Sequence, residues 1–175
     1  MTETKSERKV TVILATDVVS YSSMMEENED QTLKNLKVCR NIIEGLIDEH
    51  HGRIFNTAGD SVLAEFQSAV EAVICASEFQ KTIKERNNSV DEEERMLFRA
   101  GINMGDVVIE GDNLYGDGVN VATRLEALAQ PGGICLSRNV HEIVNKKTDF
   151  HFNDLGEQKV KDTILHAVDV VLDGS

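Results

Sequence analysis

The stretch from Val10 to Thr16 (VTVILAT) constrains the fold of this chain most strongly. It is almost continuously apolar and rich in β-branched residues, and Asp17 follows it directly. This pattern is typical of a central β-strand that is buried on both faces. A carboxylate at the end of such a strand is held on a rigid element and faces solvent, so Asp17 is a candidate functional residue.

A second carboxylate, Asp60, lies in the turn of a predicted hairpin from Arg53 to Phe66 (RIFNTAGDSVLAEF). If Asp17 and Asp60 converge in space, the two carboxylates form a divalent-metal site, and such sites commonly handle phosphates. The sequence predicts the two positions, but their convergence depends on the rest of the chain.

Composition narrows the functional classes. The chain has 175 residues, of which 41% are hydrophobic, and this fits one globular domain with a core. Its apolar stretches are too short to span a membrane, and its first residues (MTETKSERK) lack the apolar region of a signal peptide. The three cysteines have no CxxC spacing, which favours a reduced, cytoplasmic protein. The net charge of -13 argues against nucleic-acid binding but permits a nucleotide ligand.

The remaining patterns predict an α+β fold with a ferredoxin-like βαββαβ core, in which helices cover one face of a sheet. A small C-terminal α/β extension follows the core, and we expect one domain over 8–172 after an N-terminal tail over 1–7. The expected elements after the first hairpin are a helix capped by Ser68 and Glu71, a loop at Arg86–Glu94, strands at Phe98–Asn103 and Val107–Glu110 joined by a turn at Met104–Asp106, a loop at Glu110–Gly118, a helix at Val119–Ala129, a strand at Ile134–Leu136, a helix from Ser137 to Val144, and strands at Phe150–Leu155 and Leu165–Val171.

Two segments that lead into predicted helices carry polar groups. The first, Val18–Ser23 (VVSYSS), offers helix N-terminal amides and serine hydroxyls to an anion, although an ordinary N-cap cluster explains it equally well. The second, Gly116–Arg124 (GDGVNVATR), places Asn120 and Arg124 four residues apart on one helix face. Such a pair can grip a sugar oxygen and a phosphate, but it can also be an ordinary surface pair.

Taken together, these segments resemble the catalytic domain of class III nucleotidyl cyclases, the adenylyl and guanylyl cyclases. The resemblance runs from about Arg8 to Val171. It rests on four motifs in order: ATDVVSYS, HGRIFNTAGDSVLAEF, GINMGDVVIEGDNLYGDGVNVATRLEALAQPGGICLS and LGEQKVKD.

The resemblance implies a role for each matching residue. Asp17, Asp60 and the backbone carbonyl of Val18 would bind two divalent metal ions, Mg²⁺ or Mn²⁺. Asn120 and Arg124 would act on the transition state. Lys161 would be the triphosphate-binding lysine. The anion site predicted after Asp17 would add Ser20, Tyr21 and Ser22 as phosphate-binding residues. The family works as a dimer whose sites combine residues of both subunits, so a homodimer with two equivalent sites is expected.

The expected base-binding positions depart from the family pattern. Adenylyl cyclases usually select adenine with a lysine and an aspartate, and guanylyl cyclases usually have a glutamate and a cysteine there. This sequence has Asn56 and Asn113 at those positions. A side-chain amide can both donate and accept, so it can meet either purine. We therefore expect weak discrimination between ATP and GTP.

The leading hypothesis is a cyclase, a phosphorus–oxygen lyase that converts ATP to the 3′,5′-cyclic nucleotide and pyrophosphate for signalling. GTP is a candidate second substrate. The alternative is a catalytically weak or inactive domain that binds nucleotide as a regulatory module. A diguanylate cyclase ranks last, because Ala58–Val62 (AGDSV) only faintly resembles the signature of that family. The expected partners are a second copy of the chain and a regulatory domain or protein.

Overall fold

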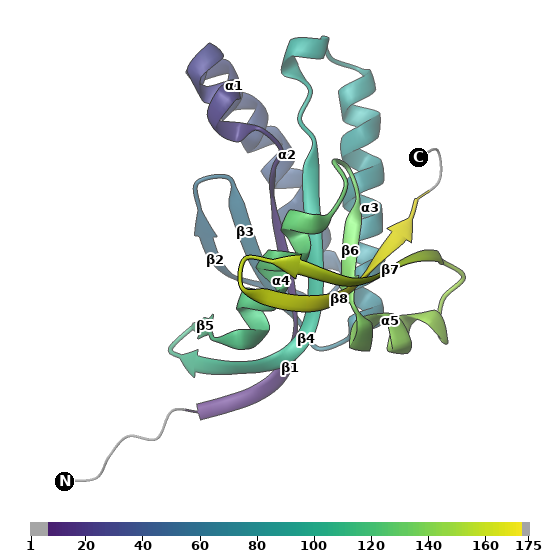
Figure 1. Ribbon diagram of the computed structural model, residues 1–175. Helices are drawn as coiled ribbons and strands as arrows, with labels where there is room; N and C mark the ends of the chain where they lie inside the picture. The colour runs from purple at the N-terminus through teal and green to yellow at the C-terminus, as the bar shows by residue number, and fades with distance from the viewer. Residues whose placement is uncertain (1–6, 173–175) are drawn as a thin grey trace, which may run out of the picture.

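The computed structural model describes residues 7–172, in which the strands form one sheet with helices packed on both of its faces (Figure 1). In chain order the elements are β1 (Glu7–Val18), α1 (Tyr21–Glu27), α2 (Glu29–Glu49), β2 (Arg53–Ala58), β3 (Ser61–Phe66), α3 (Ala69–Asn88), a short 3₁₀ helix (Glu92–Glu94), β4 (Phe98–Glu110), β5 (Asn113–Tyr115), α4 (Asp117–Leu128), β6 (Ile134–Ser137), α5 (Arg138–Asn145), β7 (His151–Val160) and β8 (Thr163–Val171). The strand order is β2-β3-β1-β4-β6-β8-β7, and β5 pairs with β4. The predicted α+β class with a C-terminal extension is confirmed.

Strand β1 is central, as its apolar run predicts. It pairs antiparallel with β3 on one side and along its whole length with β4 on the other, from Glu7 opposite Ile109 to Val18 opposite Phe98. The predicted N-terminal tail over 1–7 lies outside the described residues except for Glu7, with which β1 begins.

The turn predicted at Met104–Asp106 is wrong, because β4 runs unbroken from Phe98 to Glu110. Gly105 does not turn the chain; it pairs with Thr11 of β1 and lies against Gly118 of α4, where a Cβ on Gly105 would come within 3.1 Å of the Gly118 Cα. The glycine thus permits close packing between a strand and a helix, which sequence alone does not distinguish from a turn.

Two other predicted loops contain regular structure. Helix α3 continues to Asn88, and a 3₁₀ turn at Glu92–Glu94 follows, because Arg86 and Asn87 bind the backbone of this segment at Glu94 and Met96. Strand β5 lies within the segment expected to be a loop at Glu110–Gly118.

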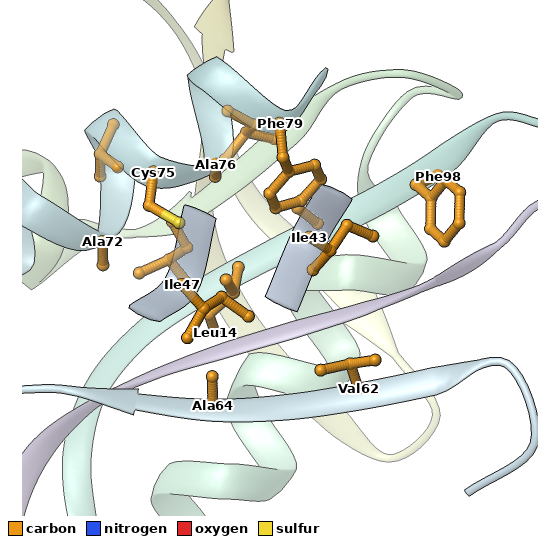
Figure 2. Close-up of a cluster of buried hydrophobic side chains, with 14 of the residues drawn as sticks. Leu14, Ile43, Ile47, Val62, Ala64, Ala72, Cys75, Ala76, Phe79 and Phe98 are labelled. Atoms are coloured by element: carbon orange, nitrogen blue, oxygen red, sulfur yellow. The ribbon is translucent and has the colours of Figure 1, made fainter. Parts of the chain in front are cut away.

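The two faces of the sheet carry different helices. Successive residues of a strand point to opposite faces, so Leu14 joins the core under α2 and α3, including Ile43 and Phe79 (Figure 2). Ile13 and Ala15 point the other way and pack against Ala122 of α4. The prediction that the helices of the βαββαβ core cover one face of the sheet is therefore confirmed for α2 and α3. Helix α4, which follows this core in the chain, covers the other face.

The C-terminal extension ends in the long hairpin of β7 and β8, whose turn contains Lys161. Leu155 and Leu165 of this hairpin pack with Leu125 of α4. Among residues 7–172, no helix is both long and apolar enough to cross a membrane.

Candidate active site

Asp17 and Asp60 lie beside each other at one end of the sheet. Antiparallel pairing between β1 and β3, from Val12 opposite Phe66 to Thr16 opposite Val62, carries the turn of the β2–β3 hairpin to the end of β1. The backbone amide of Val18 donates a hydrogen bond of 2.9 Å to Asp60 Oδ2. The structure therefore brings together the two carboxylates that the sequence singled out.

The turn that carries Asp60 is held from the neighbouring helix. Gly59, which precedes it, has a φ of 58°, a left-handed conformation that favours glycine. Arg40 of α2 donates from Nη2 to the carbonyl oxygen of Gly59 at 2.7 Å. Asp60 is thus flanked by a bond from β1 and a bond from α2.

Two residues from other elements surround the Asp17 carboxylate. Arg99 of β4 lies opposite Asp17 in the ladder and places Nη2 3.8 Å from Asp17 Oδ1. Glu126 of α4 is buried beside Asp17, and its Oε2 lies 3.9 Å from Arg99 Nε. The approach of α4 depends on Gly101, because a Cβ there would overlap the backbone of Ala122 and Glu126.

The proximity of the Asp17 and Glu126 carboxyl groups, together with their burial, changes their pKa values. Burial raises the pKa of the Glu126 carboxyl to about 8, and the adjacent Asp17 carboxylate adds to the shift. Burial also raises the pKa of Asp17, although the hydrogen bond with Glu126 and the charge of Arg99 oppose this. Glu126 therefore holds its proton more readily than an ordinary glutamate and can donate it in a hydrogen bond to Asp17.

The oxygen atoms at the end of the sheet that carries Asp17 and Asp60 are suitable ligands for divalent cations. Asp17 Oδ1 is buried, and no N–H or hydroxyl group in the described residues donates a hydrogen bond to it. Hard cations such as Mg²⁺ prefer carboxylate and carbonyl oxygens, which Asp17, Asp60 and Val18 provide. Residues 7–172 contain no cluster of three or more His, Cys, Asp or Glu side chains suited to a metal, so the fit rests on these few oxygens.

The loop after β1 contains the expected phosphate-binding residues. Ser20 has a left-handed φ of 58° and directly precedes α1 as its N-cap residue, and its side chain caps no amide of that helix. Ser22 is exposed, whereas Tyr21 is half-buried against the core below α2. The hydroxyls of Ser20 and Ser22 are therefore accessible, and the ring of Tyr21 contributes to packing.

The residues predicted to act on the transition state lie on α4. Asn120 is exposed and Arg124 is half-buried, and no side-chain hydrogen bond or ion pair holds either of them within the part of the chain that is described. With about 100° of rotation per residue, they lie roughly 120° and 160° around the helix from Glu126. Since Glu126 faces Asp17, Asn120 and Arg124 face away from the Asp17 of the same chain.

Lys161 occupies the exposed turn between β7 and β8 with a φ of 56°. The strand that follows this turn and α4 line one groove, to which Ile164 and His166 contribute from β8 and Val121 contributes from α4. Lys161 therefore lies in the turn of the hairpin that packs against α4, the helix that carries Asn120 and Arg124.

The two expected base-binding residues lie on two different hairpins. Asn56 is exposed on edge strand β2, and Asn113 begins β5, where its Nδ2 donates to Tyr115 Oη at 2.9 Å. Phe55 of β2 and Leu114 of β5, which neighbour the two asparagines, share one hydrophobic cluster. The structure thus brings the two strands together.

Comparison with known proteins identifies the family. The family described as the adenylate and guanylate cyclase catalytic domain matches residues 2–170. The chain belongs to this family.

Individual relatives of the cyclase domain agree with this assignment. A Rhizobium meliloti protein named "Putative adenylate cyclase 3" is 44% identical over 155 residues, which is 88% of this chain and 26% of that protein. The crystal structure of an adenylate/guanylate cyclase/hydrolase from Silicibacter pomeroyi superposes with a TM-score of 0.88 at 41% identity, covering 97% of this chain and all of that one. The adenylyl cyclase CyaB from P. aeruginosa, at 22% identity and a TM-score of 0.82 over 96% of each chain, shares the fold. The chain spans about a quarter or less of the length of the curated relatives that it matches.

Sequence reasoning missed two residues at the centre of the cyclase domain's candidate site, Arg99 and Glu126. One signal was available: Glu126 follows Leu125 in the apolar stripe of a helix, where a charged residue needs a partner. Arg99 gave no such signal, because its role depends on lying opposite Asp17 in the β1–β4 ladder.

Proposed function

We propose that this cyclase domain converts ATP to the 3′,5′-cyclic nucleotide and pyrophosphate at sites shared between two copies of the chain. GTP is a candidate second substrate. In a chain of this family, the convergence of Asp17 and Asp60, linked through the Val18 amide, is the observation that carries the proposal. We also propose a cytoplasmic location, where ATP and GTP are available.

The proposed reaction is attack of the ribose 3′-hydroxyl on the α-phosphorus, with pyrophosphate as the leaving group. Asp17, Asp60 and the Val18 carbonyl would hold two Mg²⁺ or Mn²⁺ ions. Bound ions of this kind lower the pKa of the attacking hydroxyl and neutralise the triphosphate. The loop residues Ser20, Tyr21 and Ser22 would bind the phosphates through their amides and hydroxyls.

The proposed transition-state residues require a second copy of the chain. Asn120 and Arg124 point away from the Asp17 of their own chain, since Glu126 on the same helix faces it. A two-fold dimer would place them over the aspartates of the partner subunit and give two equivalent sites. There Arg124 would stabilise the charge that develops on the α-phosphate, Asn120 would orient the ribose, and Lys161 would bind the triphosphate.

The proposed purine pocket lies between Asn56 and Asn113. Both residues carry amides, so the pocket can donate to or accept from either purine. This supports turnover of ATP with relaxed selectivity.

A cyclase assay with ATP or GTP, and with Mg²⁺ or Mn²⁺, tests the proposal. We expect a cyclic product and pyrophosphate in equal amounts, and no product from the Asp17→Ala variant. Mixing Asp17→Ala with Arg124→Ala should restore activity to a fraction of the dimers, because mixed dimers contain one intact site. Nucleotide binding without any product would favour the alternative.

That alternative is a nucleotide-binding regulatory module, and the substitutions at Asn56 and Asn113 are the observation that favours it. A module of this kind would have no need for the accessible Asn120 and Arg124. We propose that the regulator of the domain is a further domain or a separate protein.

A further inference from the structure

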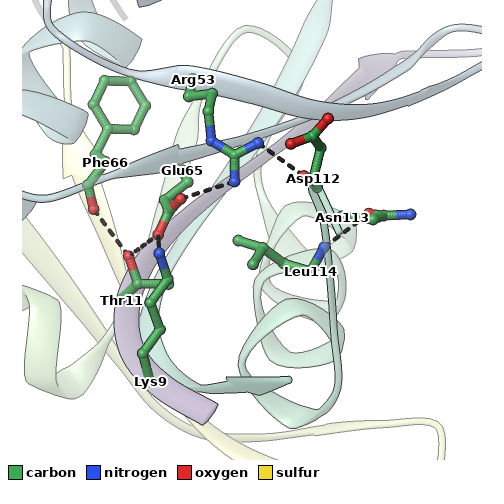
Figure 3. A network of polar contacts seen from close by, with 8 residues as sticks. All are labelled: Lys9, Thr11, Arg53, Glu65, Phe66, Asp112, Asn113 and Leu114. Carbon is green, nitrogen blue, oxygen red and sulfur yellow. Dashed lines mark hydrogen bonds and ion pairs between the residues drawn. The ribbon is translucent and has the colours of Figure 1, made fainter. Parts of the chain in front are cut away.

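A buried carboxylate at the side of the sheet organises a polar network away from the two aspartates (Figure 3). The Glu65 side chain is 9% exposed and accepts at Oε2 from Thr11 Oγ1 and Lys9 Nζ, each at 2.7 Å. Its other oxygen, Oε1, accepts from Arg53 Nη2 at 3.1 Å. Burial opposes ionisation, but hydrogen bonds from Lys9, Thr11 and Arg53 outweigh it and hold the pKa of Glu65 below its usual value.

Arg53 extends this network to a second hairpin. While Nη2 binds Glu65, Nη1 donates 2.8 Å to the backbone carbonyl of Asp112, in the turn between β4 and β5. Asp112 directly precedes Asn113, and Arg53 is three residues before Asn56. One guanidinium therefore connects the two hairpins that carry the proposed base-binding residues.

No strand pairing provides this connection. In the described part of the chain, β2 pairs only with β3, and β5 pairs only with β4. The hairpins otherwise meet through apolar contacts around Phe55, Leu63 and Leu114, which are not directional. The Arg53 bond to Asp112 is directional, so it can fix the distance between Asn56 and Asn113.

We propose that Arg53 is a positioning residue for the purine pocket. Because buried Glu65 holds its guanidinium, Arg53 fixes the distance between the β4–β5 turn and β2. This distance determines how closely Asn56 and Asn113 can both contact a purine base. This inference rests on the proposed function, because it uses the pocket assigned there.

The geometry permits a clean test. The Arg53 side chain is 47% exposed, so replacing it leaves no cavity in the core. Without Arg53, Glu65 still keeps its contacts with Lys9 and Thr11, so no buried carboxylate loses all its partners. The main loss is the tether to Asp112, and we expect the fold to tolerate it.

The experiment compares Arg53→Met and Arg53→Lys with the unchanged chain in steady-state assays with ATP and with GTP. We expect Arg53→Met to raise KM for both nucleotides by about 3- to 10-fold, the range that matches the net contribution of one hydrogen bond, with kcat within about twofold. Arg53→Lys should recover part of this loss, because an ammonium reaches one partner but lacks the planar fork that binds both.

Arg8→Met is the matched control. Arg8 is also an exposed arginine, 62% accessible, and it pairs with Asp106 across the β1–β4 ladder without contacting either hairpin turn. Its replacement should leave KM unchanged. Equal KM values for Arg53→Met and Arg8→Met would overturn the inference, as would a fall in kcat accompanied by a lower melting temperature.

A second measurement separates this inference from the proposed function. If the unchanged chain binds nucleotide but forms no cyclic product, the proposed activity fails, and the Arg53 variants are then compared by equilibrium binding of ATP and GTP with Mn²⁺. Weaker binding by Arg53→Met than by Arg8→Met upholds the positioning role, and equal binding overturns it.

Discussion

The two ends of the candidate site are built in opposite ways. The end with Asp17 and Asp60 is formed where long strand ladders and α4 meet, and it contains the buried Glu126 and the half-buried Arg99. The end with Asn56 and Asn113 lies on an edge strand and a three-residue strand, held together by the Arg53 tether and a small apolar cluster. Main-chain hydrogen bonds between strands therefore fix the position of the proposed catalytic aspartates, whereas a few side-chain contacts fix the position of the proposed base-binding asparagines. Substitutions should consequently change the geometry of the base-binding end more easily.

The largest expected effect comes from changing a carboxylate at the first end. Asp17→Asn or Asp60→Asn should lower kcat of the proposed reaction by roughly 1000-fold or more, because each change removes the charge of a proposed metal ligand. Cyclic product formation measures this, with Asp149→Asn, an exposed aspartate, as the control. Activity within tenfold of the unchanged chain would mean that the two aspartates are not the metal ligands.

A smaller effect is expected on α4. Asn120→Ala should reduce kcat by about 100-fold with little change in KM, since the side chain would orient the ribose chiefly in the transition state. Its exposure predicts an unchanged melting temperature. Asn145→Ala, at the exposed end of α5, is the matched control. A rise in KM alone would assign Asn120 to ground-state binding.

Changes at the end with Asn56 and Asn113 should affect the selectivity between ATP and GTP instead of the overall rate. Replacing Asn56 with lysine and Asn113 with aspartate should raise the ratio of kcat/KM for ATP to that for GTP by about tenfold, because the new groups recognise adenine and oppose guanine. This ratio is measured in the variant with both replacements and in the unchanged chain. An unchanged ratio would show that the purine pocket is formed by other residues.

The smallest effect is expected far from both ends. His50, 14% exposed, contacts Glu71 through Nδ1 and Glu78 through Nε2, each at 2.8 Å. Burial lowers the pKa of His50, but the hydrogen bonds with Glu78 and Glu71 outweigh it, so the pKa in the folded state lies above the ordinary histidine value of 6.5. The resulting stabilisation should be full below pH 6.5 and lost as pH rises through the folded pKa. Because Glu71 and Glu78 are partly exposed, we expect it to be no more than about 1 kcal/mol, as is typical of surface ion pairs.

Urea unfolding at pH 6 and pH 9 tests this contribution. His50→Gln should remove this part of the pH dependence, whereas His151→Gln, at an exposed position, should preserve it. Neither variant should change nucleotide selectivity. An identical pH dependence of the free energy of unfolding in His50→Gln and the unchanged chain would contradict the prediction.

The sequence by itself determined the elements whose patterns are local. The apolar run before Asp17 predicted the central strand, the hairpin around Asp60 was correct, and the periodic helix with Asn120 and Arg124 lies where it was expected. The four motifs in order also identified the family. Side-chain periodicity and turn preference act over a few residues, so a single sequence contains this information.

Only the tertiary structure decided which distant residues meet. Whether Gly105 turns the chain or admits α4 depends on what packs against it, and the sequence shows the glycine without its neighbour. Arg99 reaches Asp17 through the register of the β1–β4 ladder, and Glu126 reaches Asp17 because Gly101 lets α4 approach. Arg53 contacts Asp112 across 59 positions of sequence. These contacts follow from packing and register, which are properties of the whole fold.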